Sequence, residues 1–281
     1  STEFGIQTEG STYGQFDEQI TAGTEYKRYN YQHTHWKHTE FDGTNDYAKK
    51  DVANWQSSDD RGTIFAWVYN DGGNGIILAS SDTAGTTNFF AFWIDGDNKI
   101  VLETTSGTTS QKIRGTIAMS TGEWHSVAVV SDGTTSSIYI DAVAQDLQVQ
   151  SGTNNGDWIS SVSGRDNIST SALVHTSAAD KLDGKIAQIA YWGGSSGTDG
   201  VMTSAQIVAM HQLGPSADLT TSYSTNMAGY WTFGNKTTEG TDTASTLYDQ
   251  SSGSNDDMSF VGSPPAPSSD TKLLIHSNTD I

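Results

Sequence analysis

The sequence contains no cysteine, so its 281 residues can form no disulfide, no zinc–thiolate site and no thiol nucleophile. Proline is also scarce: it occurs only at positions 215, 264, 265 and 267, which leaves long uninterrupted strand pairing possible before them. No apolar run approaches the roughly 18 residues of a membrane-spanning helix, and Ser1-Thr2-Glu3 opens no basic and apolar leader. These absences predict a chain that does not insert into a membrane. No signal peptide is visible; a mature chain could have lost one, but the small residue at position 1 also fits simple removal of an initiator Met.

Basic residues are few as well, with 14 Lys and Arg against 33 Asp and Glu and a formal net charge of −19. Repulsion from phosphate therefore argues against nucleic acid and anionic membranes as partners. Abundant carboxylates can supply oxygen ligands for Ca²⁺, although most of these aspartates lie in turns, where the side chain caps the local backbone.

The clearest structural signal is a hairpin over 124–144, where two runs rich in β-branched residues flank Asp132-Gly133. Similar runs, separated by Gly, Asp and Ser turns, predict strands over 41–49, 63–69, 75–81, 88–94, 99–105, 112–117, 124–131, 136–141 and 185–192. Strands at this spacing indicate an all-β, two-sheet antiparallel sandwich or jelly roll. The segment 152–171 is expected to be a long polar loop around Trp158.

One short helix is predicted after the main strand series. Thr203 and Gln206 form a capping box, Ile207 and Met210 have helical spacing, and Gly214-Pro215 ends the segment. Two further strands are expected over 226–234 and 257–261, and 272–276 is expected to form a last strand or a tail.

The order of these motifs resembles the laminin-G-like branch of the concanavalin-A-like lectin/glucanase superfamily. The resemblance runs through FDGTNDY at 41–47, FAWV at 65–68, Trp124-His125, Tyr139-Ile140-Asp141 and LDGKI at 182–186. It implies a jelly roll of two curved antiparallel sheets over 41–262. The polar and aromatic segment 1–40 is expected to form an N-terminal arm, and 263–281 is expected to form a tail. One residue departs from the family pattern, because Ala142 stands where Gly usually follows the Asp, which puts the tight turn at that strand end in question.

The C-terminal part narrows the resemblance. GYWTFG at 229–234 and LYDQSSGSND at 247–256 look like a paired motif that often begins such domains, and here it follows the helix. This arrangement is similar to lectin-like virion proteins of tailed bacteriophages, especially marine ones.

Catalysis is not expected. Glucanases of this superfamily carry closely spaced carboxylates on one strand, whereas the glutamates here, at 3, 9, 18, 25, 40, 103, 123 and 239, are scattered. No nucleophile-elbow pattern is present, although a Ser-His-Asp site assembled from distant residues stays open.

Three sets of residues are candidates for binding or assembly. Loop tryptophans Trp55 and Trp158 could stack on sugars, the alternative being that each packs over a local hydrophobic patch. Loop oxygens could hold a structural Ca²⁺, as related folds often do, the alternative being simple turn capping; the candidates are Asp42, Asp46, Asp183, Asp249, Asn255 and Asp256. The arm could contact a partner through Tyr29, Tyr31, His33, His35 and Trp36.

Two functions therefore head the expectations. The first is a non-enzymatic virion surface protein, a capsid decoration or fibre made in the host cytoplasm, which is anchored to other virion proteins by its arm and displays the jelly roll to glycans. The second is a secreted, extracellular carbohydrate-binding or adhesion module, and a polysaccharide-active enzyme is disfavoured. A symmetric homo-oligomer, such as a trimer, is expected by analogy for the first function.

Overall fold

The computed structural model describes residues 13–19, 26–252, 256–265 and 267–277. The chain divides into two compact units: the larger is Lys37–Ser268, and the smaller joins Ser1–Trp36 with Ser269–Ile281. Within the described residues, no helix is both long enough and apolar enough to cross a membrane.

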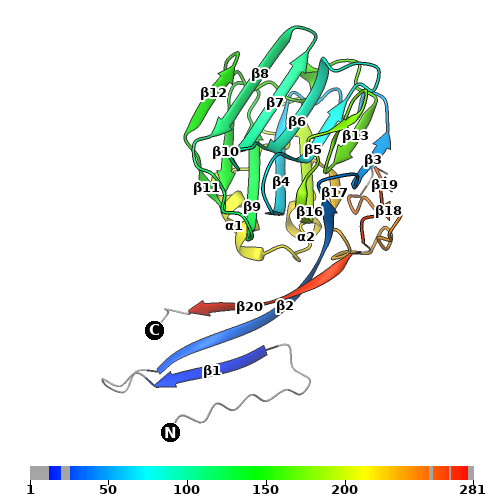
Figure 1. Cartoon of the computed structure of the whole chain (residues 1–281). Helices are drawn as coiled ribbons and strands as arrows, with labels where there is room; N and C mark the ends of the chain where they lie inside the picture. Colours follow the sequence, from blue (N-terminus) through cyan, green and yellow to red (C-terminus); the bar gives the residue numbers. More distant parts are fainter. Residues whose placement is uncertain (1–12, 20–25, 253–255, 266, 278–281) are drawn as a thin grey trace. The chain divides into compact units, whose positions relative to one another are not determined.

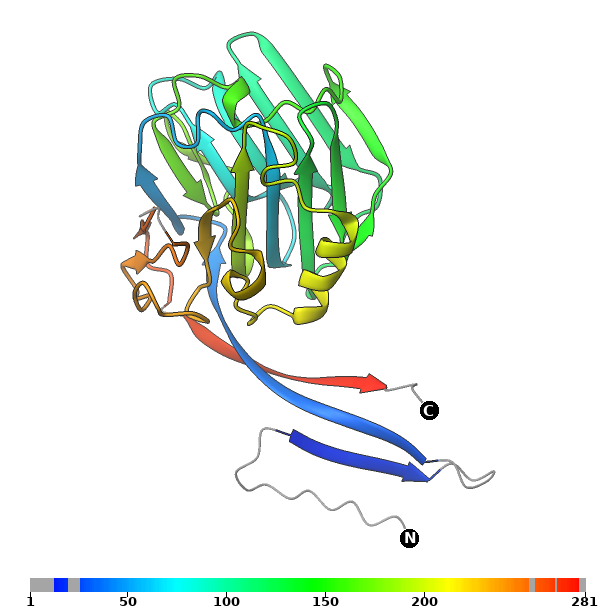
Figure 2. The same cartoon turned by 180° about the vertical axis from the view of Figure 1, so that it is seen from behind.

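The larger unit contains two antiparallel sheets (Figures 1 and 2). The first sheet has the order β2-β16-β4-β9-β10-β11, and β17 also pairs with β16. Its strands are β2 (Tyr26–Asp42), β4 (Arg61–Asn70), β9 (Trp124–Ser131), β10 (Ser136–Ile140), β11 (Val143–Ala144), β16 (Asp183–Gly194) and β17 (Met227–Trp231).

The second sheet has the order β12-β8-β7-β6-β5-β13-β3-β19-β18, and Figure 1 looks onto its outer face. Its strands are β3 (Tyr47–Asp51), β5 (Gly75–Ser81), β6 (Asn88–Ile94), β7 (Ile100–Ser106), β8 (Thr109–Gly115), β12 (Leu147–Ser151), β13 (Asn167–Thr170), β18 (Thr246–Leu247) and β19 (Met258–Val261). A separate two-stranded hairpin joins β14 (Leu173–Val174) to β15 (Ala178–Ala179).

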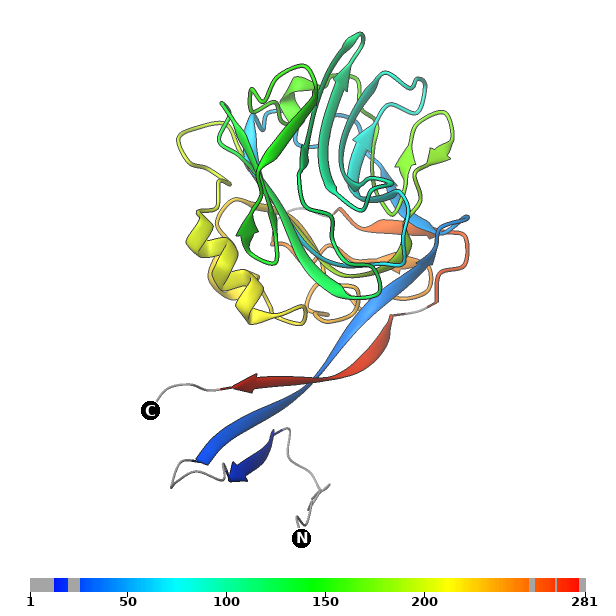
Figure 3. The same cartoon turned by 60° about the vertical axis from the view of Figure 1, so that its left-hand side comes forward.

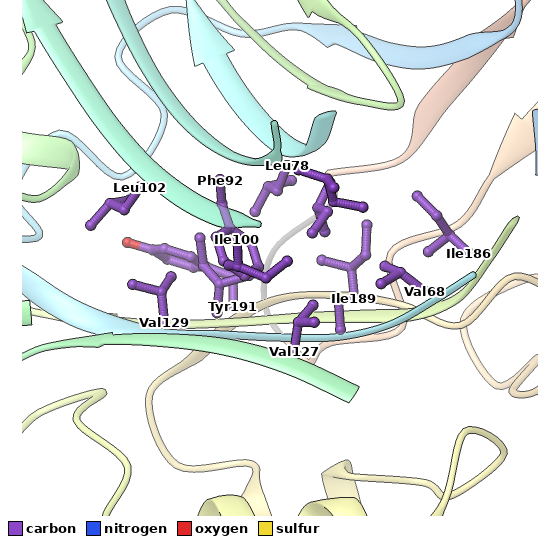
Figure 4. Packing of buried hydrophobic residues seen from close by; sticks show 14 of the residues in the cluster. Val68, Leu78, Phe92, Ile100, Leu102, Val127, Val129, Ile186, Ile189 and Tyr191 are labelled. Carbon is purple, nitrogen blue, oxygen red and sulfur yellow. The ribbon is translucent and has the colours of Figure 1, made fainter. Parts of the chain in front are cut away.

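The core lies between these sheets (Figure 4). The first sheet supplies residues such as Val68, Val127, Val129, Ile186, Ile189 and Tyr191, and the second supplies Leu78, Phe92, Ile100 and Leu102. Because side chains alternate along a strand, each strand gives this core every second residue and sends the others to the outer face. The predicted all-β sandwich is confirmed.

The helical elements are few: η1 (Ile159–Ser161), α1 (Ser204–Leu213) and α2 (Thr220–Tyr223). At the start of α1, the Thr203 hydroxyl accepts the Gln206 N–H and the Gln206 side chain accepts the Thr203 N–H, which confirms the predicted capping box. The helix ends at Gly214, whose φ of 82° suits glycine.

The smaller unit is a strand assembly. Strand β1 (Tyr13–Gln19) pairs antiparallel with β2, from Tyr13 opposite Gln32 to Gln19 opposite Tyr26. Strand β20 (Ser268–Ser277) also pairs with β2. The predicted domain limits at residues 40 and 262 stay predictions. Strand β2 runs across residue 40 without a break.

Two predicted boundaries are wrong for local reasons. The strand expected over 41–49 splits into β2 and β3, because the Asp42 carboxylate accepts the N–H groups of Thr44 (2.8 Å) and Asn45 (3.0 Å) and holds a turn there. The polar loop expected over 152–171 contains β13, a strand between β5 and β3 in the middle of the second sheet.

The turn put in question by Ala142 does form. Asp141 (φ 49°) and Ala142 (φ 63°) connect Ile140 to its partner Val143, with the two successive positive φ angles of a type I′ hairpin turn.

Candidate functional site

The two sheets differ in what covers their outer faces. On the first sheet, helix α1 lies over β4, β9 and β10 (Figures 2 and 3). The Trp67 ring stacks on His211 of α1 at 5.4 Å, and the Ser126 hydroxyl is 2.8 Å from Nδ1 of the same histidine. Tyr139 and Ser204 add a hydroxyl contact of 3.0 Å. The first sheet is therefore closed to a large ligand where the helix covers it.

The outer face of the second sheet carries aromatic and charged side chains in register. Along β6, the residues Phe90, Phe92 and Ile94 enter the core, so Phe89 and Trp93 point outward. Strand pairing sets Phe89 beside Thr105 and Ser110, sets Ala91 beside Glu103 and Lys112, and sets Trp93 beside Val101 and Arg114. We name the outward group Phe89, Trp93, Glu103, Thr105, Lys112 and Arg114 the Trp93 face.

The β14–β15 hairpin supports one side of the Trp93 face. Leu173 of β14 packs with Ile76, Ala79 and Ala91 in a small apolar cluster, against which Phe89 and Trp93 are partly buried. The hairpin thus covers the β5 side of this surface and holds the two aromatic rings, while both rings keep some exposure.

Ion pairs order the charged side chains of the Trp93 face. The Lys112 ammonium lies 4.5 Å from the Trp93 ring centroid and 3.3 Å from the Glu103 carboxylate. Arg114 binds Asp95 at 2.9 Å and Asp97 at 3.0 Å, and the hydrogen bond that it donates to Asp95 raises the pKa of the Arg114 guanidinium. The result is a broad surface with an aromatic centre, hydroxyl groups and fixed charges of both signs.

A small hollow lies beside the core, between β7, β8 and the 153–157 loop. Its volume is about 10 Å³, which holds about one water molecule and no sugar. This hollow is therefore too small to be a glycan site.

The structure places the two predicted sugar-stacking tryptophans in the core. Trp158 is 0% exposed and its indole N–H donates to the Tyr191 hydroxyl at 3.2 Å. Trp55 is 3% exposed and its indole N–H donates to the Asp256 carboxylate at 2.6 Å. Neither ring face is available to a ligand, so the expectation of sugar stacking is wrong for both residues. The alternative, burial over a hydrophobic patch, describes them.

Buried polar groups surround these two rings. Tyr191 donates its hydroxyl hydrogen bond to Asp59 at 2.8 Å, and burial raises the pKa of both groups. Burial likewise lowers the pKa of Arg165 to about 10. The Arg165 guanidinium donates to the Trp55 carbonyl at 3.0 Å. This network fixes loops over the core and does not open to a substrate.

Asp42 and Asp46 lie in one turn and Asp249 and Asp256 in one late loop, and these four carboxylates already accept hydrogen bonds. Asp42 caps its own turn, where backbone N–H groups lower its pKa, and its strand partner is Asp183. Asp46 accepts the Ser263 N–H at 2.7 Å. Asp249 accepts the N–H groups of Tyr230 (2.9 Å), Ser251 (2.9 Å) and Asp256 (3.2 Å), and Asp256 also binds Lys50 at 3.1 Å.

Within the described residues, no three His, Cys, Asp or Glu side chains converge on a possible metal position. Asn255 lies outside the described residues. Structural Ca²⁺ therefore stays a prediction, and carbonyl and amide oxygens would have to complete its shell.

The predicted arm residues Tyr29, Tyr31, His33 and His35 lie in β2, but their side chains are outside the described part of the structure. Trp36 is buried, with 5% of its surface exposed. A role of these five residues in assembly, and a homo-oligomer built through them, stay predictions.

A Ser-His-Asp arrangement that sequence spacing could not locate joins β9 to the turn after β10. Ser120 Oγ lies 2.8 Å from His125 Nε2, and His125 Nδ1 lies 2.7 Å from Asp141. However, the Ser120 hydroxyl also lies 2.9 Å from the Glu123 carboxylate, to which it donates, so its proton is not directed at His125 alone as in a hydrolase triad. The Asp141 hydrogen bond raises the pKa of His125.

The comparisons with known proteins agree with this architecture. Residues 42–202, more than half of the chain, match the laminin-G model of the concanavalin A-like lectin/glucanases superfamily. The chain belongs to this superfamily. No curated protein sequence matches it.

Two solved structures show how this superfamily fold recurs. A carbohydrate-binding module (CBM40) of the Ruminococcus gnavus IT-sialidase, bound to α2,3-sialyllactose, matches with TM-score 0.50 and 11% identity over 63% of this chain and 98% of the module. A candidate carbohydrate-binding protein of Bacteroides ovatus matches with TM-score 0.53 and 14% identity over 94% of this chain and 66% of its own. At such identities the likeness concerns the fold. Neither match links this superfamily member to a bacteriophage, so its predicted virion role, location and virion partners stay predictions.

Proposed function

We propose that the chain is a non-enzymatic carbohydrate-binding module and that its glycan lies across the Trp93 face. The observation that carries this proposal is the combination of Trp93 and Phe89, partly exposed, with Glu103, Thr105 and Lys112 on neighbouring strands. Aromatic rings offer apolar area at a low cost in conformational entropy, and the polar groups can pair with sugar hydroxyls.

Rigidity supports the same proposal. Strands β6, β7 and β8 are internal to the second sheet, each paired on both sides, so their outward side chains have fixed spacing. Side chains presented by a sheet position a ligand better than side chains on a free loop. The structural neighbours add a precedent, since the R. gnavus module of similar fold is bound to sialyllactose.

The non-catalytic part of the proposal rests on the absence of suitable chemistry among the described residues. Glu103 stands beside Lys112 and not beside a second carboxylate, as a retaining or inverting glycosidase would require. In the Ser120–His125–Asp141 arrangement the serine hydroxyl donates to Glu123, which competes with His125 for the serine proton.

A glycan array probed with the full chain tests the proposal. We expect wild type to bind a defined set of glycans and Trp93→Ala to bind them about 30-fold more weakly, the loss of a buried aromatic contact of about 2 kcal/mol. Val143→Ala removes apolar surface from β11 of the first sheet, where the valine is 61% exposed, and should bind as wild type does. Equal binding by wild type and a folded Trp93→Ala protein would overturn the proposed site.

A further inference from the structure

Both cations of the Trp93 face, Lys112 and Arg114, are already paired with carboxylates. Lys112 is held by Glu103, and Arg114 is held by both Asp95 and Asp97. Two cations thus face three carboxylates, and the whole chain carries a formal charge of −19. An acidic sugar would have to displace one of these carboxylates and remain close to the others, within the ~8 Å over which charge acts at physiological salt.

A neutral sugar meets no such obstacle. The Lys112 ammonium lies over the Trp93 ring because the ring face is electron-rich. The C–H face of a pyranose carries partial positive charge, so the same ring face attracts it as well. If a sugar takes that position, Lys112 keeps Glu103 as its partner and can donate to sugar hydroxyls. No charge is left unpaired by the exchange.

The spacing of the two aromatic residues limits the size of the ligand. Phe89 and Trp93 are four residues apart on β6, which at about 3.3 Å per residue separates them by about 13 Å. This distance is longer than one sugar ring, so a single sugar cannot contact both side chains.

From these observations we infer that the Trp93 face selects an uncharged oligosaccharide, which runs along β6 from Phe89 to Trp93, over acidic glycans. The inference rests on the proposed function of the same face and adds the chemical class of its ligand.

Calorimetry with three matched probes tests the inference. The probes are the neutral oligosaccharide with the strongest array signal, its monosaccharide, and the same oligosaccharide oxidised to the uronate at C6. We expect the neutral oligosaccharide to bind at least about tenfold more tightly than the uronate form and than the monosaccharide, with little dependence on salt.

A variant that removes the negative charge of Glu103 tests the preference for uncharged glycans independently. Glu103→Gln leaves an acceptor in place but frees Lys112, so the affinity for the uronate probe, measured relative to that for the neutral probe, should rise about tenfold. Glu40→Gln makes the same charge change at an exposed position of β2 in the first sheet and should alter neither affinity.

The outcomes separate the two proposals. Tighter binding of the uronate probe, weakened by salt, would overturn the inference and leave carbohydrate binding intact. Equal affinity for monosaccharide and oligosaccharide would overturn the two-ring geometry. Absence of binding to every glycan on the array would instead overturn the proposed function.

Discussion

The turn after β10 offers a sharp test of the backbone, because an alanine occupies a conformation that favours glycine. Ala142 has φ 63°, in the left-handed region, where a Cβ atom costs about 1–2 kcal/mol. Ala142→Gly should remove that strain. The extra freedom of glycine in the unfolded chain costs about 0.5–1 kcal/mol in return. We therefore expect the free energy of unfolding to rise, by up to about 1.5 kcal/mol.

Urea unfolding measured by circular dichroism would detect this gain as a higher midpoint at an unchanged slope. The matched control is Ala144→Gly, two residues further on in β11. This substitution deletes the same methyl group from an exposed strand residue whose φ is not positive. That substitution should destabilise the protein by about 0.5–1 kcal/mol. If both substitutions destabilise equally, the reasoning about turn strain is refuted.

Three further substitutions probe the buried polar groups and the core. Asp141→Asn removes the charge partner of His125, whose pKa is raised by Asp141. The stabilisation of the folded state by this ion pair is complete below pH 6.5, the pKa of histidine in the unfolded chain, and is lost as pH rises through the raised pKa of the folded state. The deficit of the variant in urea unfolding should thus be about 1–2 kcal/mol near pH 5.5, at the low end because the Asp141 side chain is 40% exposed, and should shrink as pH rises above 6.5, while Asp146→Asn shows no such change. Asp249→Ala strands three buried N–H groups and should cost about 3 kcal/mol or more by urea unfolding; a loss under about 1 kcal/mol would contradict the hydrogen-bond assignment. Trp158→Ala opens a core cavity and should cost about 3–5 kcal/mol by the same assay, whereas a near-neutral effect would mean the ring is not core.

Strand positions were the most predictable feature. The alternation of apolar and polar residues along a strand, and the residues that favour turns, both depend only on neighbours in the sequence. The ranges 75–81, 88–94 and 124–131 match β5, β6 and β9. Strand β13 escaped prediction since its buried residues are polar and are satisfied by distant partners. Asn167, for example, donates to the carbonyls of Ser81 and Val174, both at 2.9 Å.

The candidate site was less predictable because it, like β13, depends on contacts between residues that are far apart in the sequence. Trp93 looks like a core residue in the apolar run FFAFWI, but its outward position follows from the pairing of β6 with β7. The available signal was the alternation of Glu103 and Thr105 along β7, which marks that side of the sheet as polar. Trp158 looks like a loop residue, and only the path of its loop across the core reveals its burial.

The central claim is that a glycan binds on the Trp93 face of the second sheet. A crystal structure of the full chain with a bound neutral oligosaccharide tests it most directly. We predict electron density for sugar rings over β6, β7 and β8, with one ring on Trp93 and the Lys112 ammonium within hydrogen-bonding distance of a sugar hydroxyl. Sugar density on the loops or on the first sheet, with the Trp93 face empty, would contradict the claim.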